Sequence, residues 1–393
     1  MTVVVVTKLR TSNLGNLALS RHLIEHARRN DVVIALDRPM ALSAFSLDWL
    51  SSRSDPVRAI DWAARFIACL PTLLPPIPPP GECTRFVTPT AASASLLASM
   101  RPWLRGVKPL LPGYRRRWAT LRNASTVLVA GAGAVTDHDS LVHLLVEVRA
   151  LHLAGIDVRP ICQSVTVTNP ALRAALGHVY AALPRIAVRG ASSKAALVGL
   201  GVAPGRIEIA ADFVWWVESS SAHRGPRAGV GVSLTPGVVR EAGPRLSSLI
   251  DVATGSGEPV TAISSDHAQD QIVLEAQVVN SGLRRQPVIA DASHYVDDLA
   301  SYRLIITARF HTAVLGLVAG TPVVVLSERR DDRAVETLTR LGYPVDVVRV
   351  DQDNAAVVLQ DRVRQARLLS PAQLAGVVTA ARQESLLQLS GRG

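Results

Sequence analysis

The stretch SYRLIITARFHTAVLGLVAGTPVVVLS, from Ser301 to Ser327, decides the fold. Its first apolar, β-branched run predicts a strand at residues 303–307, and the apolar residues that follow have helical spacing. Gly320 is placed to end that helix, and a second apolar run predicts a strand at 322–326. A strand, a helix and a further strand in this order are typical of an α/β protein with a parallel sheet.

The same alternation recurs on the N-terminal side of this stretch. The runs are almost continuously apolar, which indicates parallel sheets covered on both faces. We predict further strands at residues 3–6, 32–36, 126–130, 157–161, 186–188, 206–210, 229–234, 259–263 and 287–289, and helices that include 17–28, 192–199 and 371–389.

The length of 393 residues fits two domains better than one. The polar, Gly- and Pro-bearing stretch ESSSAHRGPRAG, at 218–229, is the best boundary. We therefore predict two Rossmann-like domains, 1–218 and 226–393, that face a central cleft, with a C-terminal helix in the second. The first domain carries a proline-rich insertion near 71–81, PTLLPPIPPPG, which we expect to be a loop.

Composition limits the classes of partner. Hydrophobic residues make up 48% of the chain and charged residues 19%, so most of it should fold. The net charge of +10 favours anionic partners such as phosphorylated metabolites, acidic glycans or lipid surfaces. The three cysteines have no metal-type spacing, so we expect no metal and a reducing compartment. No apolar stretch reaches the length of a membrane span, and the N-terminus lacks a signal sequence, so we expect a cytoplasmic protein.

Arg309 and His311 are the strongest candidates for a functional site. They follow the strand at 303–307, and ligands bind open α/β sheets at the carboxyl ends of their strands. Residues two apart in an extended segment point the same way, so both side chains can face a ligand while Phe310 turns into the core. A helix beginning near His311 favours an anion there. The structural alternative is an arginine in a salt bridge and a histidine that caps a helix.

Two glycine-bearing turns are weaker candidates. Asn13 and Gly15 precede a predicted helix, and Gly131 and Gly133 lie between a strand and a helix that we expect to be capped near Asp137 or Asp139. Glycine lets the backbone approach a ligand closely, but an ordinary structural turn explains both stretches equally well. Neither has the full spacing of a dinucleotide-binding motif.

Arg189 and Asp212 also follow predicted strands. Arg189 projects from the end of the strand at 186–188, and Asp212 follows the strand at 206–210, where it could orient an arginine or a substrate hydroxyl. An ordinary surface position is the alternative for Arg189 in a chain so rich in arginine.

The segment 101–122 holds seven basic and no acidic residues, with Trp103, Tyr114 and Trp118 between them. Two interpretations stay open: a solvated basic face, or a surface that contacts anionic lipid at the membrane. Single-stranded nucleic acid also suits such a pattern, but no nucleic-acid motif accompanies it, so we expect no nucleic acid partner.

In this order, five segments resemble the polysaccharide pyruvyltransferase family. They are NLGNLAL, VLVAGAGAVTD, ICQSV, IAVRGASSKAALVGLGV with the later Ala211-Asp212, and LIITARFHTAVLGLVAGTPVVVLS. The chain departs from the family pattern at Asn16, where an aspartate is usual, and at Ala308, where a glycine is common.

The resemblance implies a GT-B-like fold and a bacterial transferase of cell-envelope polysaccharide biosynthesis. Members move the pyruvyl group of phosphoenolpyruvate to a sugar, often as a cyclic ketal, so we expect phosphoenolpyruvate as donor substrate and no cofactor. The acceptor would be a polysaccharide, a glycolipid or a lipid-linked oligosaccharide, the last two at the inner face of the membrane. The N-terminal domain would bind the acceptor and the C-terminal domain phosphoenolpyruvate.

The resemblance also implies roles for single residues. Arg189 and Arg309, one from each domain, would hold the anions of the donor, and His311 would act as acid or base. The other expected substrate-binding residues are Asp212, Asn13, Gly15, Gly131, Gly133, Gln163 and Ser164.

Two other functions stay open. A GT-B glycosyltransferase that uses a nucleotide sugar would share the architecture. Glu328 and Glu336 have the spacing of a glutamate pair in some such enzymes, but here they follow the Gly-x-Pro strand, so we interpret the match as chance. A non-catalytic glycan- or lipid-binding protein could also use this scaffold.

Overall fold

A computed structural model describes residues 2–7, 13–29, 31–37, 45–73, 111–131, 134–220, 226–255, 257–266, 270, 283–328 and 333–389. The chain forms two compact units. Unit 1 comprises Met1–Thr7, Ala27–Val188 and Ser193–Glu208, and unit 2 comprises Lys8–His26, Arg189–Ser192 and Ile209–Gly393.

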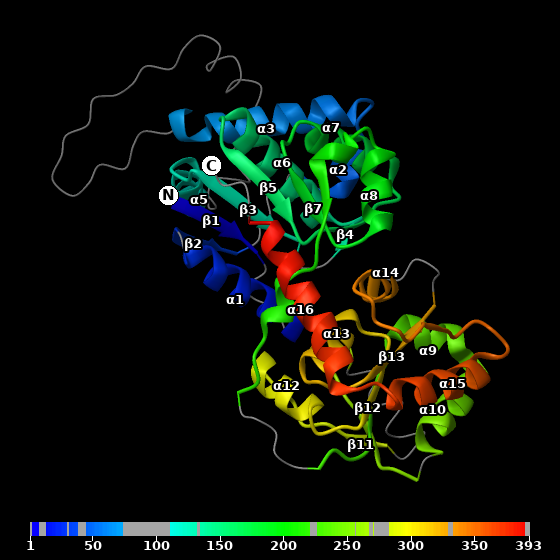
Figure 1. The fold of residues 1–393 in the computed structure, drawn as a ribbon. Coiled ribbons are helices and arrows are strands. Elements are labelled where there is room, and N and C mark those ends of the chain that lie inside the picture. The colour runs from blue at the N-terminus through cyan, green and yellow to red at the C-terminus, as the bar shows by residue number, and fades with distance from the viewer. Residues whose placement is uncertain are drawn as a thin grey trace. The chain divides into compact units, whose positions relative to one another are not determined.

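Unit 1 is built on a parallel sheet of four strands in the order β2-β1-β3-β5. Four consecutive valines of β1 are almost fully buried, because parallel strands are covered on both faces. Helices α3, α6 and α7 pack together over one face of the sheet (Figure 1). Its strands are β1 (Thr2–Val6), β2 (Val32–Leu36), β3 (Thr126–Ala130), β4 (Ala134–Thr136), β5 (Asp157–Ile161), β6 (Ser164–Thr166), β7 (Ile186–Val188) and β8 (Ile207–Ile209, whose last residue joins unit 2). Its helices are α2 (Leu47–Ser51), α3 (Pro56–Leu73), α5 (Leu111–Arg122), α6 (Asp139–Leu153), α7 (Pro170–Ala181), α8 (Ala191–Val198, whose first two residues join unit 2) and η2 (Pro204–Arg206).

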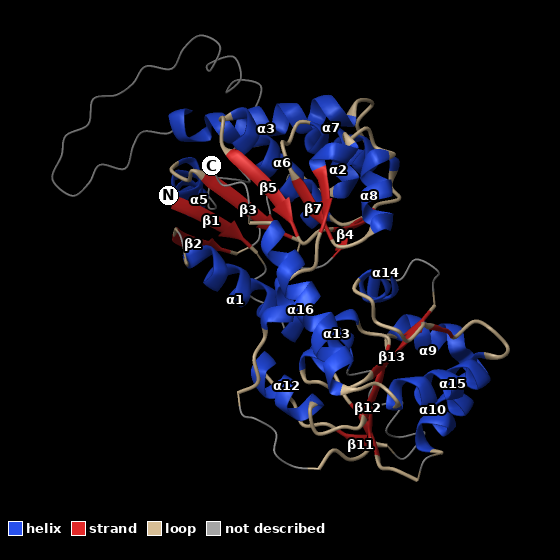
Figure 2. Cartoon of the chain, in the orientation of Figure 1, coloured by secondary structure: helices blue, strands red, loops and turns tan. Residues whose placement is uncertain are grey.

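Unit 2 contains a parallel sheet of six strands in the order β11-β10-β9-β12-β13-β14. Helices α12, α13 and α16 lie on one side of its central strands, and α9, α10 and α15 on the other (Figure 2). The strands are β9 (Val230–Ser233), β10 (Val260–Ala262), β11 (Arg284–Arg285), β12 (Leu304–Thr307), β13 (Val323–Ser327) and β14 (Val348–Arg349). The helices are α1 (Leu14–Arg28, whose last two residues join unit 1), η3 (Phe213–Trp216), α9 (Pro236–Ala242), η4 (Gly243–Arg245), α10 (Leu246–Thr254), α12 (Ala292–Leu299), α13 (Phe310–Val318), α14 (Arg333–Arg340), α15 (Ala355–Arg367) and α16 (Pro371–Leu387).

Most predicted elements are confirmed, and Gly320 ends α13 as expected. Its φ of 70° lies in the left-handed region, which glycine adopts at little cost after a helix. The strand predicted at 287–289 is wrong: the edge strand is Arg284–Arg285, whose backbone pairs with β10. The helix predicted to begin at residue 17 begins at Leu14, because Asn13 caps it.

Two other expectations are refined by the structure. The proline-rich loop expected from residue 71 does not begin there, because α3 continues to Leu73; residues 74–81 lie outside the described residues. Helix α6 was expected to be capped near Asp137 or Asp139, and its cap is His138 between them, which accepts the Ser140 N–H.

The grouping into compact units differs from the predicted division at 218–226. Residues 8–26 and 189–192 precede that boundary in sequence and yet group with unit 2. Helix α16 also packs in unit 2, where Nε1 of Trp216 donates a hydrogen bond of 2.7 Å to Oγ of Ser385. Arg189 and Arg309 therefore belong to the same compact unit, and not to different ones.

The basic segment 101–122 is only partly described, since residues 101–110 lie outside the described residues. Within α5, Trp118 is buried, and Arg117 is buried in an ion pair with Glu147. These two members of the segment contribute to the core of unit 1 and do not form a solvated or lipid-facing surface. Among the helices that the structure describes, none is both long enough and apolar enough to cross a membrane.

Candidate functional site

Arg309 and His311 lie where β12 passes into α13. Arg309 has an extended backbone, at φ −96° and ψ 120°, and occupies the N-cap position of α13. Its N–H donates to Oγ1 of Thr307 at 2.9 Å, which holds the turn between strand and helix. Because α13 already begins at Phe310, the extended arrangement expected for residues 309–311 ends at Arg309.

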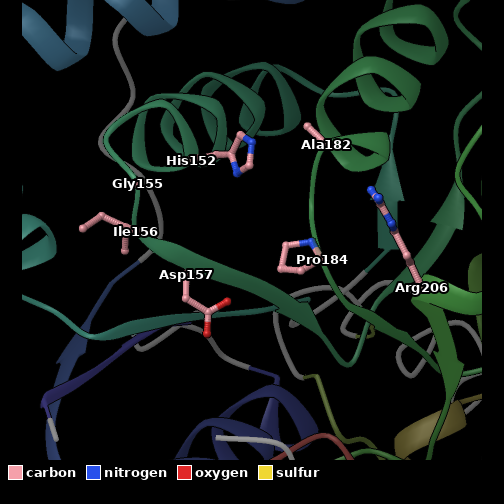
Figure 3. A pocket seen from close by; sticks show the side chains of 7 residues that line it. All are labelled: His152, Gly155, Ile156, Asp157, Ala182, Pro184 and Arg206. Carbon is pink, nitrogen blue, oxygen red and sulfur yellow. The ribbon is translucent and has the colours of Figure 1, made fainter. Parts of the chain in front are cut away.

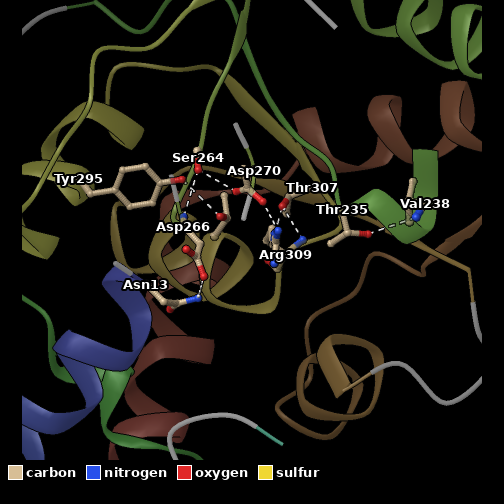
Figure 4. Close-up of polar contacts among 10 residues, drawn as sticks. Asn13, Thr235, Val238, Ser264, Asp266, Asp270, Tyr295, Thr307 and Arg309 are labelled. Atoms are coloured by element: carbon tan, nitrogen blue, oxygen red, sulfur yellow. Dashed lines mark hydrogen bonds and ion pairs between the residues drawn. The ribbon is translucent and has the colours of Figure 1, made fainter. Parts of the chain in front are cut away.

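The guanidinium of Arg309 forms an ion pair with the buried carboxylate of Asp270 (Figure 4). Asp270 also accepts a hydrogen bond of 2.7 Å from Oγ of Ser264. Burial raises the pKa of Asp270, against the opposing effects of Arg309 and the Ser264 hydroxyl. The side chain of Arg309 retains 16% exposure, so the pair holds the arginine at the surface of unit 2.

A second buried ion pair joins Arg189 and Asp212. Nη2 of Arg189 lies 3.0 Å from Oδ2 of Asp212, and both side chains are at most 3% exposed. Oδ1 of Asp212 accepts the N–H of Val214 at 3.0 Å and so caps η3. Burial raises the pKa of Asp212, although Arg189 and the Val214 N–H act in the opposite direction. Nε of Arg189 is buried and makes no hydrogen bond among the described residues.

His311 lies between Asn13 and Asp212. Its Nδ1 is 3.2 Å from Oδ1 of Asn13, and its Nε2 is 4.0 Å from Oδ2 of Asp212. The ring also packs against the α-carbon of Gly15, where a β-carbon would lie only 2.0 Å from the imidazole Cγ. Gly15 therefore permits a close approach, but the group that approaches in this structure is His311.

Phe310 does not turn into the core as the sequence pattern suggested. Its side chain is only half-buried, and the guanidinium of Arg189 lies 5.5 Å from the centre of its ring. A cation over an aromatic face is attracted by the ring's electron density. Phe310 thus helps to hold Arg189 beside the Asp212 carboxylate.

Six of the predicted site residues therefore group together in unit 2. They are Asn13, Gly15, Arg189, Asp212, Arg309 and His311. Asp266 and Asp270 were not predicted. The run ISSD after β10, which ends in Asp266, nevertheless carries the same signal that singled out Arg309, namely polar residues at the carboxyl end of a parallel strand.

The other predicted residues lie in unit 1, after β3 and β5. Nε2 of Gln163 donates to the carbonyls of Val129 and Ile161 at 2.9 and 3.2 Å, which braces the two strands. A β-carbon on Gly131 would lie 2.8 Å from the Gln163 amide, so glycine is required there by packing. Ser164 is buried in β6. Gly133 lies outside the described residues, and a substrate role for this group stays a prediction.

Unit 1 also contains an open hollow of about 510 Å³ (Figure 3). Its lining includes Asp157, the first residue of β5, so it lies at the amino end of that strand, opposite the edge at which α/β sheets bind ligands. Arg159 forms an ion pair with the Asp157 carboxylate, and the carbonyl of Ala181 accepts a hydrogen bond from Arg206. The candidate functional site is therefore the one at Arg309 and His311.

The structure has a GT-B-like fold. UDP-N-acetylglucosamine 2-epimerase from Rickettsia bellii superposes with a TM-score of 0.54 at 10% identity, covering 99% of this chain and 94% of that one. UDP-GlcNAc 2-epimerase from Methanocaldococcus jannaschii gives a TM-score of 0.51 at 10% identity, covering 99% and 100%. At such low identity the likeness establishes the fold alone.

The family follows from the sequence. The pattern of the family described as polysaccharide pyruvyl transferase matches residues 13–330, which span the site from Asn13 to His311. The chain belongs to this family and is a transferase. No curated protein matches the chain.

Proposed function

We propose that this protein transfers the pyruvyl group of phosphoenolpyruvate to a sugar of a glycan, forms a cyclic ketal and releases phosphate. The observation that carries the proposal is the grouping of Arg189, Asp212, Arg309 and His311 in a member of the pyruvyl transferase family. The donor requires no cofactor, because its enol phosphate is already activated.

The two arginines suit the anions of the donor. Phosphoenolpyruvate carries a phosphate and a carboxylate, and the planar fork of a guanidinium binds either with two parallel hydrogen bonds. Asp212 and Asp270 each hold one arginine through an ion pair, and the buried Nε of Arg189 keeps a donor that no described residue uses. An incoming anion would therefore find both guanidinium groups already oriented.

The proton balance assigns His311 its role. The methylene carbon of phosphoenolpyruvate gains a proton, two acceptor hydroxyls lose one each as they bond to the central carbon, and the carbon–oxygen bond to phosphate breaks. One hydroxyl proton thus balances the new methyl group and the other leaves with phosphate. His311, with Asp212 4.0 Å from its Nε2, is the group that exchanges these protons.

The acceptor and the place of the reaction extend the same proposal. A polysaccharide, glycolipid or lipid-linked oligosaccharide would supply the two hydroxyls, and the reaction would take place in the cytoplasm, where phosphoenolpyruvate is available. The Gln163 and Gly131 region of unit 1 would bind the acceptor. Contact of the basic segment 101–122, apart from the buried Arg117 and Trp118, with the inner face of the membrane belongs to this proposal for lipid-linked acceptors.

The main rival is a GT-B glycosyltransferase that consumes a nucleotide sugar. The assay incubates the protein with phosphoenolpyruvate and a panel of glycan acceptors, and follows phosphate release together with the mass of the acceptor. We expect acceptor-dependent phosphate release and acceptors that carry a ketal-linked pyruvyl group. Consumption of a nucleotide sugar in place of phosphoenolpyruvate would refute the proposal.

His311→Ala should lower kcat by about 10²- to 10⁴-fold, the usual contribution of an acid–base group, without loss of the fold. The matched control is His294→Ala. This histidine also lies in unit 2, but its side chain is 69% exposed, next to Asp291, so its removal should leave turnover unchanged. A His311→Ala enzyme with a near-normal rate would exclude the proton role.

A further inference from the structure

His311 is held by a chain of hydrogen bonds that begins at Asp266. Nδ2 of Asn13 donates to Oδ2 of Asp266 at 3.1 Å, and Oδ1 of Asn13 faces Nδ1 of His311 at 3.2 Å (Figure 4 shows the first of these contacts). Asp266 is 3% exposed and follows β10. The chain therefore runs from a buried carboxylate, through one amide, to the imidazole.

The direction of each hydrogen bond follows from its partners. A carboxylate only accepts, so the Asn13 atom that faces Asp266 must be the NH₂ group. The backbone N–H of Asn16 donates to the other amide atom at 3.0 Å, which must therefore be the oxygen. Since that oxygen also faces Nδ1 of His311, Nδ1 must carry the hydrogen. In the neutral ring, Nε2 then carries the lone pair and no hydrogen.

We propose that Asn13 and Asp266 are positioning residues that fix His311 in the tautomer with hydrogen on Nδ1, so that Nε2 is the atom that exchanges protons. The catalytic meaning of this tautomer rests on the proposed pyruvyl transfer, but the tautomer itself does not. Nε2 is also the nitrogen closer to Asp212, so it faces the Arg189–Asp212 pair.

The backbone around Asn13 makes the arrangement rigid. Asn13 and Asp266 form an antiparallel bridge, and the Leu14 N–H donates to the carbonyl of Ser265 at 2.8 Å. The Asp266 N–H in turn donates to Oγ of Ser264 at 3.1 Å. Any rotation of the Asn13 amide would bring its oxygen toward the Asp266 carboxylate, which repels it. Gly15 completes the support, because its α-carbon packs against the imidazole.

The test reads the tautomer directly in the full-length protein labelled with ¹⁵N-histidine. Nitrogen chemical shifts and proton couplings distinguish hydrogen on Nδ1 from hydrogen on Nε2, and a His311→Asn sample assigns the signals. Well above the titration of the ring, the wild type should show hydrogen on Nδ1 and a bare Nε2. Hydrogen on Nε2 would overturn the proposal.

Variants separate positioning from capping. Asn13→Ala should let both tautomers appear and lower kcat on the order of 10-fold to 100-fold, the usual cost of removing a group that orients a histidine. The KM for phosphoenolpyruvate should stay within about twofold, because Asn13 acts through His311.

The matched control is Asn169→Ala. Asn169 also caps a helix, with its Oδ1 accepting the N–H groups of Ala171 and Leu172, but it is far from His311 in sequence and lies in unit 1. The Asn169→Ala substitution should lower the stability of the protein by the contribution of one helix cap and leave the His311 signals unchanged. His311 signals and a pH profile that survive Asn13→Ala unaltered would also contradict the proposal. If phosphoenolpyruvate is not used at all, the proposed function fails, while the nitrogen spectra still decide the tautomer.

Discussion

Two buried arginine–carboxylate pairs, one in each unit, differ in how completely their hydrogen bonds are made. In unit 1, Nε and Nη2 of Arg117 donate to the two oxygens of Glu147 at 2.9 and 2.7 Å, and Nη1 donates to the carbonyl of Asp37. In unit 2, Nη2 of Arg189 lies 3.0 Å from Asp212, while its Nε makes no hydrogen bond among the described residues.

This difference is the one that the proposed function predicts between a structural pair and a ligand-binding pair. Burying a charge costs free energy that only matched hydrogen bonds offset, so the forked Arg117–Glu147 pair is what folding alone requires. A buried donor without an acceptor costs about 1 to 3 kcal/mol, and such a cost persists where a ligand supplies the acceptor. Under the proposed function, an anion of the donor would accept a hydrogen bond from Nε of Arg189, whereas Nε, Nη1 and Nη2 of Arg117 already have acceptors in unit 1.

The largest effects should come from substituting these two arginines. Arg117→Met leaves Glu147 as an unpaired buried charge and should cost about 3 to 5 kcal/mol of stability, with kcat/KM of the folded fraction unchanged. Arg189→Lys keeps the charge but loses the fork, and should lower kcat/KM by about 10²- to 10³-fold with little loss of stability. Denaturant unfolding and the phosphate-release assay measure the two quantities.

The double variant Arg117→Met, Glu147→Leu controls the first substitution, because removing both charges should restore most of the stability. If Arg189→Lys unfolds the protein, or if Arg117→Met slows turnover by the folded fraction, the two pairs do not differ in role as predicted.

Two glycines should give the next largest effects. Gly15→Ala would improve helix propensity by about 1 kcal/mol, but its β-carbon would displace the imidazole of His311. We expect kcat to fall about tenfold, since small displacements of catalytic groups are costly. Gly177→Ala in α7 would instead meet the carbonyl of Leu200 at 2.5 Å and should lower stability by about 1 to 3 kcal/mol without affecting turnover. A Gly15→Ala enzyme with normal kcat would show that the imidazole position does not matter.

The smallest effect concerns Asp61, which joins three helices of unit 1. It lies in α3 and accepts hydrogen bonds from Arg149 in α6 at 2.7 Å and His178 in α7 at 3.0 Å. Burial opposes the charge, but these two partners outweigh it and lower the pKa of Asp61. Asp61 contributes roughly 1 kcal/mol to the stability of the fold at pH values above the ordinary pKa of aspartate. This contribution is lost as the pH falls through the lowered pKa of Asp61 in the folded state.

The Asp61→Asn variant should therefore be less stable than the wild type at neutral pH. The two stabilities should converge as the pH falls, which denaturant unfolding at a series of acid pH values measures. A stability difference that stays constant over the acid range would contradict this assignment. The pH dependence expected for Asp212 runs in the opposite direction. Burial raises the pKa of Asp212, so its contribution to the stability of the fold declines as the pH rises through the raised value.

Local patterns predicted much of the fold. The valines of β1 and the segment from β12 to β13 were assigned correctly, because buried parallel strands require apolar residues and a left-handed helix end favours glycine. The strand at 287–289 failed for the complementary reason: the edge strand Arg284–Arg285 pairs through its backbone and has exposed side chains, so no apolar run marks it.

The candidate site was predictable only in part. Arg309 and His311 were visible because both follow a strand in a stretch whose order of elements is clear from the sequence. Asp266 and Asp270 carried a similar but weaker signal after a short strand. The partnership of Asn13 with His311, which are 298 positions apart, has no local signature.

The sequence by itself determined the family, the parallel strands and the two residue types, arginine and histidine, at the end of β12. These properties depend on residues that are close together in the sequence and on the spacing of apolar residues, and both can be read from the sequence of one chain. Only the tertiary structure decided that Arg189 pairs with Asp212, that His311 packs against Gly15, and which residues lie beside the two nitrogens of His311. Those properties depend on distances of a few ångströms between segments far apart in the chain, and packing alone sets such distances.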